Sequence, residues 1–132
     1  MKKNGVVHFE IYAHDAKKLA AFYSSLFDWT IEDMPGMDYH YVKTVDTDEQ
    51  GMPTRPGGIN GGLVVRPAGY EDRGWINYIN VEALDASVKR AQDLGARVMK
   101  PRAPVPGMGW FAMLADPQGN TFALWERDPG AK

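Results

Sequence analysis

The sequence predicts an α+β protein built from two βαβββ modules, with a curved mixed sheet, helices on the outside and a concave cleft. The first observation is a strand pattern at residues 7–11, where apolar and polar side chains alternate, followed by an amphipathic helix pattern. The second is a repeat of this pattern later in the chain, in a register that places Ile76 on His8. Further strand patterns follow each helix, so the chain is predicted to be a duplicated unit.

The first module is predicted to span about residues 5–67. Asp15 occupies the expected N-cap position of its helix, where a carboxylate can accept hydrogen bonds from the amides of the first turn. The apolar residues of this helix recur at helical spacing and predict one buried face: Leu19, Phe22, Tyr23, Leu26 and Phe27. Strands are predicted at residues 28–32, 39–45 and 57–66, and a polar loop at residues 46–56.

The second module is predicted to span about residues 74–127 and to repeat this plan. A strand at residues 76–81 precedes a helix whose apolar positions again recur at helical spacing: Leu84, Val88, Ala91 and Gly95. The remaining strands are predicted at residues 97–100, 110–115 and 121–126, with a turn at 116–119. Both modules are predicted to share one domain, residues 1–132, because this length suffices for a single core.

The composition is that of an ordinary soluble globular protein, with 44% apolar and 24% charged residues. A net charge of −2 and the lack of a basic run argue against a nucleic acid partner. The absence of cysteine excludes disulfides, thiol catalysis and thiolate metal sites. No apolar run reaches the roughly 20 residues that cross a bilayer, and none follows the basic start of the chain. We therefore expect a cytoplasmic protein without a membrane partner.

Stretches from both halves carry a family resemblance: residues 7–15, 21–29, 86–96 and 109–125. The Asp-Pro-Gln-Gly turn at 116–119, just before the last apolar strand, is the most specific of these features. The chain resembles the vicinal oxygen chelate superfamily, which includes glyoxalase I, extradiol dioxygenases and bleomycin resistance proteins, and within it the lactoylglutathione lyase-related branch. The resemblance implies a small-molecule ligand and a homodimer. It does not choose one function, since the superfamily hosts isomerisation, ring cleavage and drug sequestration.

The resemblance also implies where a metal would be bound. Metal-dependent members place ligands at four strand positions, and the first of these falls on His8. The second falls within residues 57–66, which contain no Asp, Glu or His, and the others fall on Ile76 and Ala123. First-row metals need several converging donors, so we expect the usual metal site to be absent and predict no cofactor.

A rearranged divalent metal site around His8 remains open. Glu10 shares the face of His8 on the first strand, and His40 lies on the strand predicted at residues 39–45. Glu126 lies on the last strand but on the face opposite to Ala123. His8 and Glu10 alone give two donors, so the others would come from His40 or from a second chain.

His8 and Glu10 are the candidate catalytic residues and the first candidates for ligand binding. An imidazole can act near neutral pH as a base or as a hydrogen-bond donor, although His8 could equally be bonded to a neighbouring strand. A carboxylate in the middle of a cleft-facing strand must be solvated or paired. The candidate partners of Glu10 are His8, Arg66 and a cationic group of a ligand.

Aromatic residues are the other candidates for ligand binding: Tyr41, Tyr78, Trp110 and Trp125. Tyr78 points into the predicted cleft if it shares the face of Ile76, and Trp125 does so if it shares the face of Ala123. Such walls suit a planar or cationic small molecule. The alternatives are packing in the core or in a dimer interface, where Trp and Tyr are also enriched.

Three functions follow from these observations. The leading one is a small-molecule-binding protein of the glyoxalase and bleomycin-resistance type that lacks the usual metal site. The second is a metal-dependent lyase or dioxygenase with a rearranged site around His8. The third is a non-catalytic interaction module whose cleft is filled by its own side chains. The sequence leaves open whether the protein is an enzyme and which ligand it binds.

Overall fold

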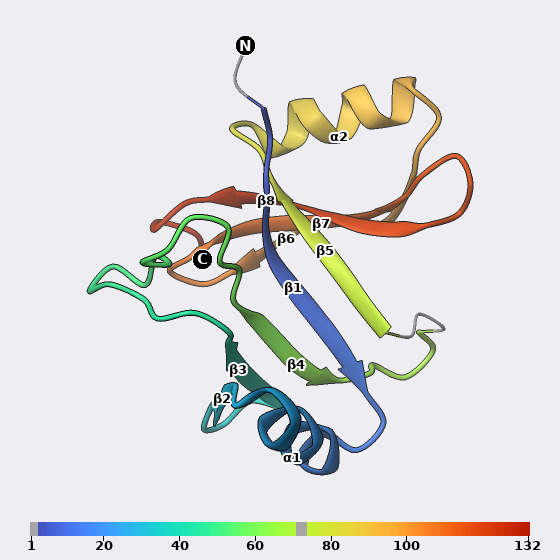
Figure 1. Cartoon of the computed structure of the whole chain (residues 1–132). Helices are drawn as coiled ribbons and strands as arrows, with labels where there is room; N and C mark the ends of the chain where they lie inside the picture. The colour runs from blue at the N-terminus through green and yellow to red at the C-terminus, as the bar shows by residue number, and fades with distance from the viewer. Residues whose placement is uncertain (1–2, 71–73) are drawn as a thin grey trace. The chain divides into compact units, whose positions relative to one another are not determined.

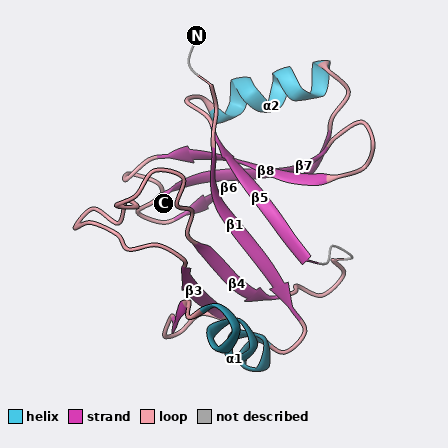
Figure 2. Ribbon diagram, in the orientation of Figure 1, coloured by secondary structure: helices cyan, strands magenta, loops and turns pink. Residues whose placement is uncertain are grey.

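A computed structural model describes residues 3–70 and 74–132, and within them the chain forms eight strands and two helices (Figures 1 and 2). The chain divides into two compact units. The first unit is His8–Trp75, and the second combines the residues up to Val7 with Ile76–Lys132. Each unit holds one helix and four strands of mixed direction, which confirms the predicted α+β class and the duplicated plan.

The elements of the first unit are β1 (Val6–Ala13), α1 (Ala16–Phe27), β2 (Thr30–Asp33), β3 (Tyr39–Lys43) and β4 (Gly61–Val65). Its strands are ordered β2-β3-β4-β1, where β1 runs parallel to β4 and the other neighbours are antiparallel. Asp15 is confirmed as the N-cap of α1, because its carboxylate accepts a hydrogen bond of 3.1 Å from the amide of Lys18.

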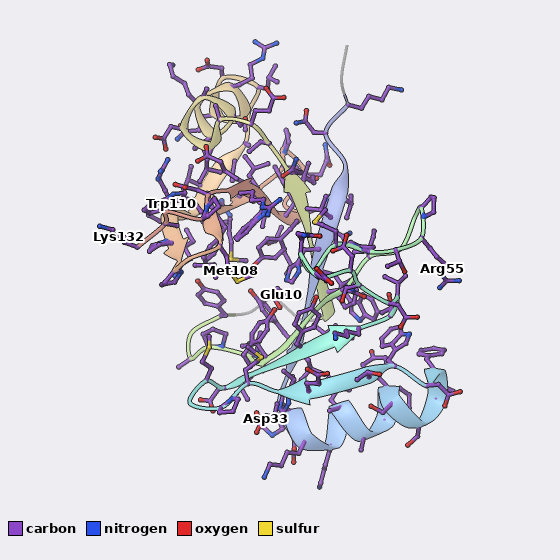
Figure 3. The ribbon with its side chains drawn as sticks, turned by 90° about the vertical axis from the view of Figure 1, so that its left-hand side faces the viewer. Glu10, Asp33, Arg55, Met108, Trp110 and Lys132 are labelled. Atoms are coloured by element: carbon purple, nitrogen blue, oxygen red, sulfur yellow. The ribbon has the colours of Figure 1, made fainter. Side chains whose placement is uncertain are left out.

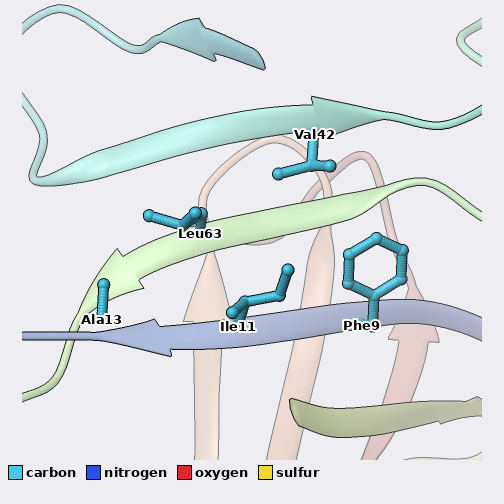
Figure 4. Close-up of a cluster of buried hydrophobic side chains, with 5 residues drawn as sticks. All are labelled: Phe9, Ile11, Ala13, Val42 and Leu63. Carbon is cyan, nitrogen blue, oxygen red and sulfur yellow. The ribbon is translucent and has the colours of Figure 1, made fainter. Parts of the chain in front are cut away.

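The core of the first unit lies between this sheet and α1. Alternate residues of β1 join β3 and β4 in a buried cluster: Phe9, Ile11, Ala13, Val42 and Leu63 (Figure 4). Leu19, Ala20 and Tyr23 of α1 pack against it. Because successive side chains of a strand point to opposite faces, the other face of β1 carries His8, Glu10 and Tyr12.

The predicted buried face of α1 is only partly correct. Phe22, Leu26 and Phe27 are each about half exposed, so they do not belong to the core. The helix meets the sheet along the narrower stripe of Leu19, Ala20 and Tyr23, and the outer rings instead contact Tyr23, with Phe22 at a ring-centroid distance of 5.2 Å. Helical spacing alone does not give the width of the buried stripe.

The strand that closes the first unit is shorter than predicted, since β4 begins at Gly61 rather than at residue 57. The buried side chain of Asn60 explains this limit. Its carbonyl oxygen accepts hydrogen bonds from the amides of Thr44 and Val45, at 2.8 and 3.0 Å, and its amide donates to the carbonyl of Val45. The side chain therefore satisfies backbone groups that a longer strand pair would have used.

The second unit contains β5 (Gly74–Asn80) from Ile76 onward, α2 (Leu84–Asp93), β6 (Arg97–Val105), β7 (Gly109–Ala115) and β8 (Thr121–Arg127). Its strands are ordered β5-β8-β7-β6, with β5 parallel to β8 and the others antiparallel. Its core repeats that of the first unit and packs under α2: Val81, Leu84, Ala112, Leu114 and Leu124.

The two helices begin in different ways. The N-cap residue of α2 is Ala83, which offers no side-chain acceptor. The free amide of Leu84 instead donates to Glu126 Oε1 of β8 over 2.8 Å. Glu126 is thereby assigned to helix capping rather than to a ligand set.

The description of two separate units leaves two expectations about the organisation of the chain untested. The concave cleft and the single domain spanning residues 1–132 stay predictions. Among the residues that the structure describes, no helix is both long and apolar enough to cross a membrane.

Candidate functional site

The side chains of His8 and Glu10 lie on the face of the first sheet that points away from α1, because Phe9 and Ile11 occupy the helix side (Figure 3 labels Glu10). The ladder between β1 and β4 places Glu10 opposite Gly62. Tyr41 pairs with the same glycine from β3. Glu10, Gly62 and Tyr41 therefore form one row across three strands.

Three polar atoms from β1 and β3 meet at Glu10. His8 Nε2 lies 3.3 Å from Glu10 Oε1, and the Tyr39 hydroxyl donates to the same oxygen over 3.3 Å. Tyr39 Oη and His8 Nε2 are 3.4 Å apart. We call His8, Glu10 and Tyr39 the polar triad. It brings the two candidate catalytic residues together with a tyrosine that the sequence reasoning did not select.

Gly62 makes this meeting possible. A Cβ at position 62 would overlap both the Tyr39 hydroxyl and the Glu10 carboxylate. The absence of a side chain thus lets Tyr39 reach across β4 to β1. The glycines of the predicted 57–66 strand were a signal of close backbone approach, but they did not indicate which side chain would use the space.

Glu10 is the least satisfied polar group of the triad. Its side chain is only 14% exposed, whereas that of His8 is 33% exposed. Glu10 Oε2 is buried and has no hydrogen-bond partner within the described part of the chain. An unsatisfied buried polar group typically costs about 1–3 kcal/mol, and more when it is charged. Glu10 therefore has the properties of an acceptor that a ligand or an ion could satisfy.

Tyr41 lies in the same row and has a charged neighbour. Lys43 Nζ lies 5.8 Å from the centre of its ring, and this ammonium also pairs with Glu32 over 3.9 Å. The Tyr41 ring is only partly buried, so part of its aromatic surface is accessible next to the triad.

Two other residues weighed as partners lie elsewhere. His40 lies on the α1 side of β3, because Val42 of the same strand points into the core under that helix. It pairs with Asp33, at 3.8 Å between His40 Nδ1 and Asp33 Oδ1. Glu10 has His8 as its ionic partner rather than Arg66. The alternative in which His40 completes a metal site around His8 is therefore not supported by the position of His40.

In the second unit, Tyr78 and Trp125 lie on the face away from α2. Tyr78 is buried and pairs with Ala123 of β8, two residues before Trp125. Trp125 lies opposite Phe111 of β7, and the rings of Tyr78 and Phe111 are 6.2 Å apart. The sequence reasoning missed Phe111, although strand alternation puts it on the same face as Met113, the cross-strand partner of Ala123.

Trp110 lies on the opposite face of β7 and packs against the core under α2 (Figure 3). Its indole nitrogen donates to Asp128 Oδ2 over 2.9 Å, and the guanidinium of Arg102 stacks 4.2 Å from its ring centre. The hydrogen bond from Trp110, followed by that from the Gly130 amide, holds the pKa of Asp128 below its usual value. These contacts give Trp110 a structural role, and it is left out of the proposed ligand site.

The donor chemistry does not fit the metal site that the superfamily resemblance implies. Ile76 and Ala123 are buried apolar residues without donor atoms, and β4 supplies only Gly, Leu and Val. Over residues 3–70 and 74–132, no three His, Cys, Asp or Glu side chains form a group that could hold a metal ion.

Comparison with known proteins gives a consistent set of relatives. Residues 7–125 match the family described as Glyoxalase-like domain. The chain is 30% identical over 114 residues to CFP32 of Mycobacterium tuberculosis, which is named only provisionally as a glyoxylase; the match covers 83% of this chain and 39% of CFP32. It is also 30% identical over 130 residues to the anthracycline biosynthesis protein DnrV of Streptomyces peucetius, covering 90% of this chain and 46% of DnrV.

Among solved structures, a variant of Streptomyces coelicolor methylmalonyl-CoA epimerase in complex with 2-nitronate-propionyl-CoA superposes with a TM-score of 0.61. The identity is 18% and the match covers 97% of both chains, so this likeness shows the fold alone. The present chain spans less than half the length of CFP32 and of DnrV.

Proposed function

We propose that this chain, which belongs to the glyoxalase-like family of the vicinal oxygen chelate superfamily, binds a small molecule at the polar triad. The same superfamily holds bleomycin resistance proteins and dioxygenases. The chain binds this molecule without the superfamily's usual metal site. The observation that carries this proposal is the buried, unpartnered oxygen of Glu10, beside a histidine that solvent can reach.

The chemistry around Glu10 favours a ligand with a planar or cationic portion. A buried carboxylate binds an N–H, O–H or ammonium donor strongly, since hydrogen bonds to charged groups contribute about 1.5–3 kcal/mol. The ring of Tyr41 offers an aromatic surface in the same row. The names of the relatives agree with a small organic ligand, because DnrV is a protein of anthracycline biosynthesis and the epimerase holds a coenzyme A derivative.

We propose that Tyr78 and Trp125, with Phe111 between them in register, form an aromatic ligand contact of their own in the second unit. They lie on the face of the second sheet away from α2, as His8 and Glu10 lie away from α1. If they bind a ligand, Trp125→Phe weakens the binding of a planar compound in the screen described below. Unchanged binding of every compound in Trp125→Phe removes this contact from the proposal.

The test is a thermal-shift screen of planar and cationic small molecules, run in the presence of a metal chelator. A compound that binds only the folded state raises the melting temperature, and the rise grows with the logarithm of the ratio of its free concentration to its Kd. We expect such a rise in the natural protein and in Glu49→Gln, which changes an exposed loop carboxylate, but not in Glu10→Gln. No shift from any compound, or equal shifts in all three proteins, would count against the triad as the site.

We also propose that the protein is a homodimer and that α1 contributes its interface. Phe22, Leu26 and Phe27 are about half exposed on this helix, and Trp75 adds a fourth exposed apolar side chain. Contiguous apolar surface of this kind marks interaction sites. A second copy also fits the relatives, which are more than twice as long as the part this chain matches.

Sedimentation at micromolar concentration tests the dimer. Leu26→Glu is expected to give monomers, because it buries a charge in the proposed interface, whereas the exposed Lys17→Glu on the same helix leaves the dimer intact. A monomer in the natural protein removes the proposal. The expected cytoplasmic location stays a prediction, to be checked by cell fractionation.

A further inference from the structure

We infer that the aromatic contact of the second unit selects a planar aromatic anion, an aryl carboxylate or a phenolate, and that Lys100 of β6 binds the negative charge. The inference rests on the contact of Tyr78, Phe111 and Trp125 proposed above, to which it adds the charge of the compound that this contact prefers. We call these three rings and Lys100 the aromatic platform. All four residues lie within the second unit.

The strand pairing places Lys100 on the same sheet face as the rings. One row of paired residues crosses all four strands of the unit: Tyr78 of β5, Ala123 of β8, Met113 of β7 and Lys100 of β6. In the neighbouring row, Trp125 pairs with Phe111, which lies two residues from Met113 along β7. Because paired residues, and residues two apart on a strand, point to the same face, Lys100 lies on the side of the rings.

Phe111 contacts both a ring and a charge. Its ring centre is 6.2 Å from that of Tyr78 and 5.9 Å from Lys100 Nζ. An ammonium at this distance is attracted by the negative face of an aromatic ring. The Lys100 ammonium is therefore held at the rings rather than extended away from them, and one small molecule can reach both.

The Trp125 indole packs against the backbone of β7. A Cβ at Gly109 would lie 2.7 and 2.8 Å from Cζ2 and Cη2 of this indole, so the glycine makes room for the ring. Trp125 and Phe111 are only partly buried. Part of each ring is therefore accessible to a planar compound that stacks on the platform.

The charged residues on this face are all cations. The four strands of the unit contain one acidic residue, Glu126, and it lies on the α2 side, where it caps that helix. Arg102 also lies on the α2 side, where it pairs with Asp85 and stacks on Trp110. The other cations of the strands share the face of the rings, since their cross-strand partners alternate with Phe111 or lie in its rows: Arg97, Lys100 and Arg127.

Lys100 is the cation best placed to bind the ligand. It is partly buried, whereas Arg97 and Arg127 are exposed. In the part of the chain that the structure describes, no carboxylate forms an ion pair with any of the three. A partly buried charge is screened less by salt than an exposed one, so a ligand carboxylate gains most at Lys100.

A cationic ligand suits this platform less well. Aromatic rings attract cations, but three positive side chains on one face repel them and attract an anion. The two units thereby offer opposite chemistry. Glu10 presents a buried acceptor in the first unit, and Lys100 presents a donor beside aromatic rings in the second.

Calorimetric titration with 2-naphthoate and 2-naphthamide tests the inference. The two probes share a planar ring system, but the first is an anion and the second is neutral. We expect the natural protein to bind naphthoate about tenfold more tightly at low salt, since hydrogen bonds between charged groups are stronger than those to a neutral amide. This advantage should shrink as the ionic strength rises, while the affinity for naphthamide stays constant.

Variants assign the preference to Lys100. Lys100→Met removes the ammonium but keeps an unbranched side chain, so it should lower the affinity for naphthoate to that for naphthamide. Lys100→Arg keeps the charge and should keep the preference. Lys89→Met is the matched control, because it removes an exposed ammonium from α2, on the other side of the sheet, and should bind both probes as the natural protein does. Trp125→Phe should weaken the binding of both probes by the same factor.

Equal affinity of the natural protein for the two probes overturns the inference, and so does a preference for naphthoate that survives in Lys100→Met or that Lys89→Met also removes. If the probes bind equally and Trp125→Phe weakens both, the aromatic contact stands and its charge preference falls. If neither probe binds, the contact falls together with the inference. Neither result bears on the polar triad, which the thermal-shift screen tests. Circular dichroism of each variant confirms that it is folded before its affinities are compared.

Discussion

The two units share one plan, yet the faces of their sheets that point away from the helices differ in chemistry. In the first unit this face carries His8 and Glu10 on β1. In the second, the matching strand β5 carries Ile76 and Tyr78. Gly62 lies opposite Glu10, whereas Ala123 lies opposite Tyr78.

This difference shows which sheet face can vary in residue type between the two units. The core side of each sheet must stay apolar because a helix covers it, and both cores are built from Val, Leu, Ile, Phe and Ala. The other face of each sheet is not covered by the helix of its unit, so one unit can carry polar side chains there and the other unit aromatic ones. Polar chemistry is thereby concentrated in the first unit.

The cores should be the part in which the two units behave alike, and here the largest effects are expected. Leu63→Ala in the first unit and Leu114→Ala in the second each remove a fully buried side chain. Each should lower the free energy of unfolding by about 2–5 kcal/mol. Urea unfolding followed by tryptophan fluorescence measures both. A loss below about 1 kcal/mol in only one of them would show that the two cores are not equivalent.

The glycine opposite Glu10 should separate the units. Gly62→Ala places a methyl group against Tyr39 and Glu10 and should cost about 1–3 kcal/mol of unfolding free energy, as overpacking does. Gly5→Ala is the control, because a Cβ there meets nothing within 4 Å. Equal stabilities of the two variants would mean that Tyr39 does not reach over β4.

The helix caps offer a finer comparison. Asp15→Ala removes the cap of α1, and Glu126→Ala removes the acceptor for the first turn of α2. Each should cost about 0.5–2 kcal/mol by chemical denaturation. Glu49→Ala, in an exposed loop, is a control for the loss of one acidic charge. If Glu126→Ala were as stable as the natural protein, the hydrogen bond between Glu126 and Leu84 would not stabilise α2.

The smallest effect is expected at the turn before β8. The side chain of Asn120, and then its amide, hold the pKa of Asp116 below its ordinary value of 3.8. A carboxyl group whose pKa is lower in the folded state stabilises the fold above its unfolded pKa, and this contribution is lost as the pH falls through the folded value. The stability difference between the natural protein and Asn120→Ala should therefore be largest near neutral pH and vanish in strong acid. An NMR titration of Asp116 shows whether its pKa rises in the variant.

Alternation along the strands was enough to predict much of the fold. It gave the core side of β1 and the placement of His8 and Glu10 together on the other side, because a period of two residues is a local property. The cap at Asp15 and the turn at residues 116–119 were predictable for the same reason, since each depends on a few neighbouring residues.

The polar triad could not be predicted in full because it depends on register. Tyr39 reaches Glu10 only since β3 and β1 flank β4 at Gly62, and no local pattern states that alignment. Trp110 packs on the core side of β7 because it alternates with Phe111 along the strand, and its part in ligand binding stays a prediction. Asn60 shortened β4 through contacts with Thr44 and Val45, which are distant in sequence.

The cap that Glu126 provides for α2 also sets an order of events during synthesis of the chain. The partners of the α1 cap are only 3 residues apart, so this cap needs no later part of the chain. The acceptor for Leu84 lies 42 residues farther on, in β8. The first unit can therefore complete its helix while translation continues, whereas the start of α2 is held only once β8 has emerged and docked.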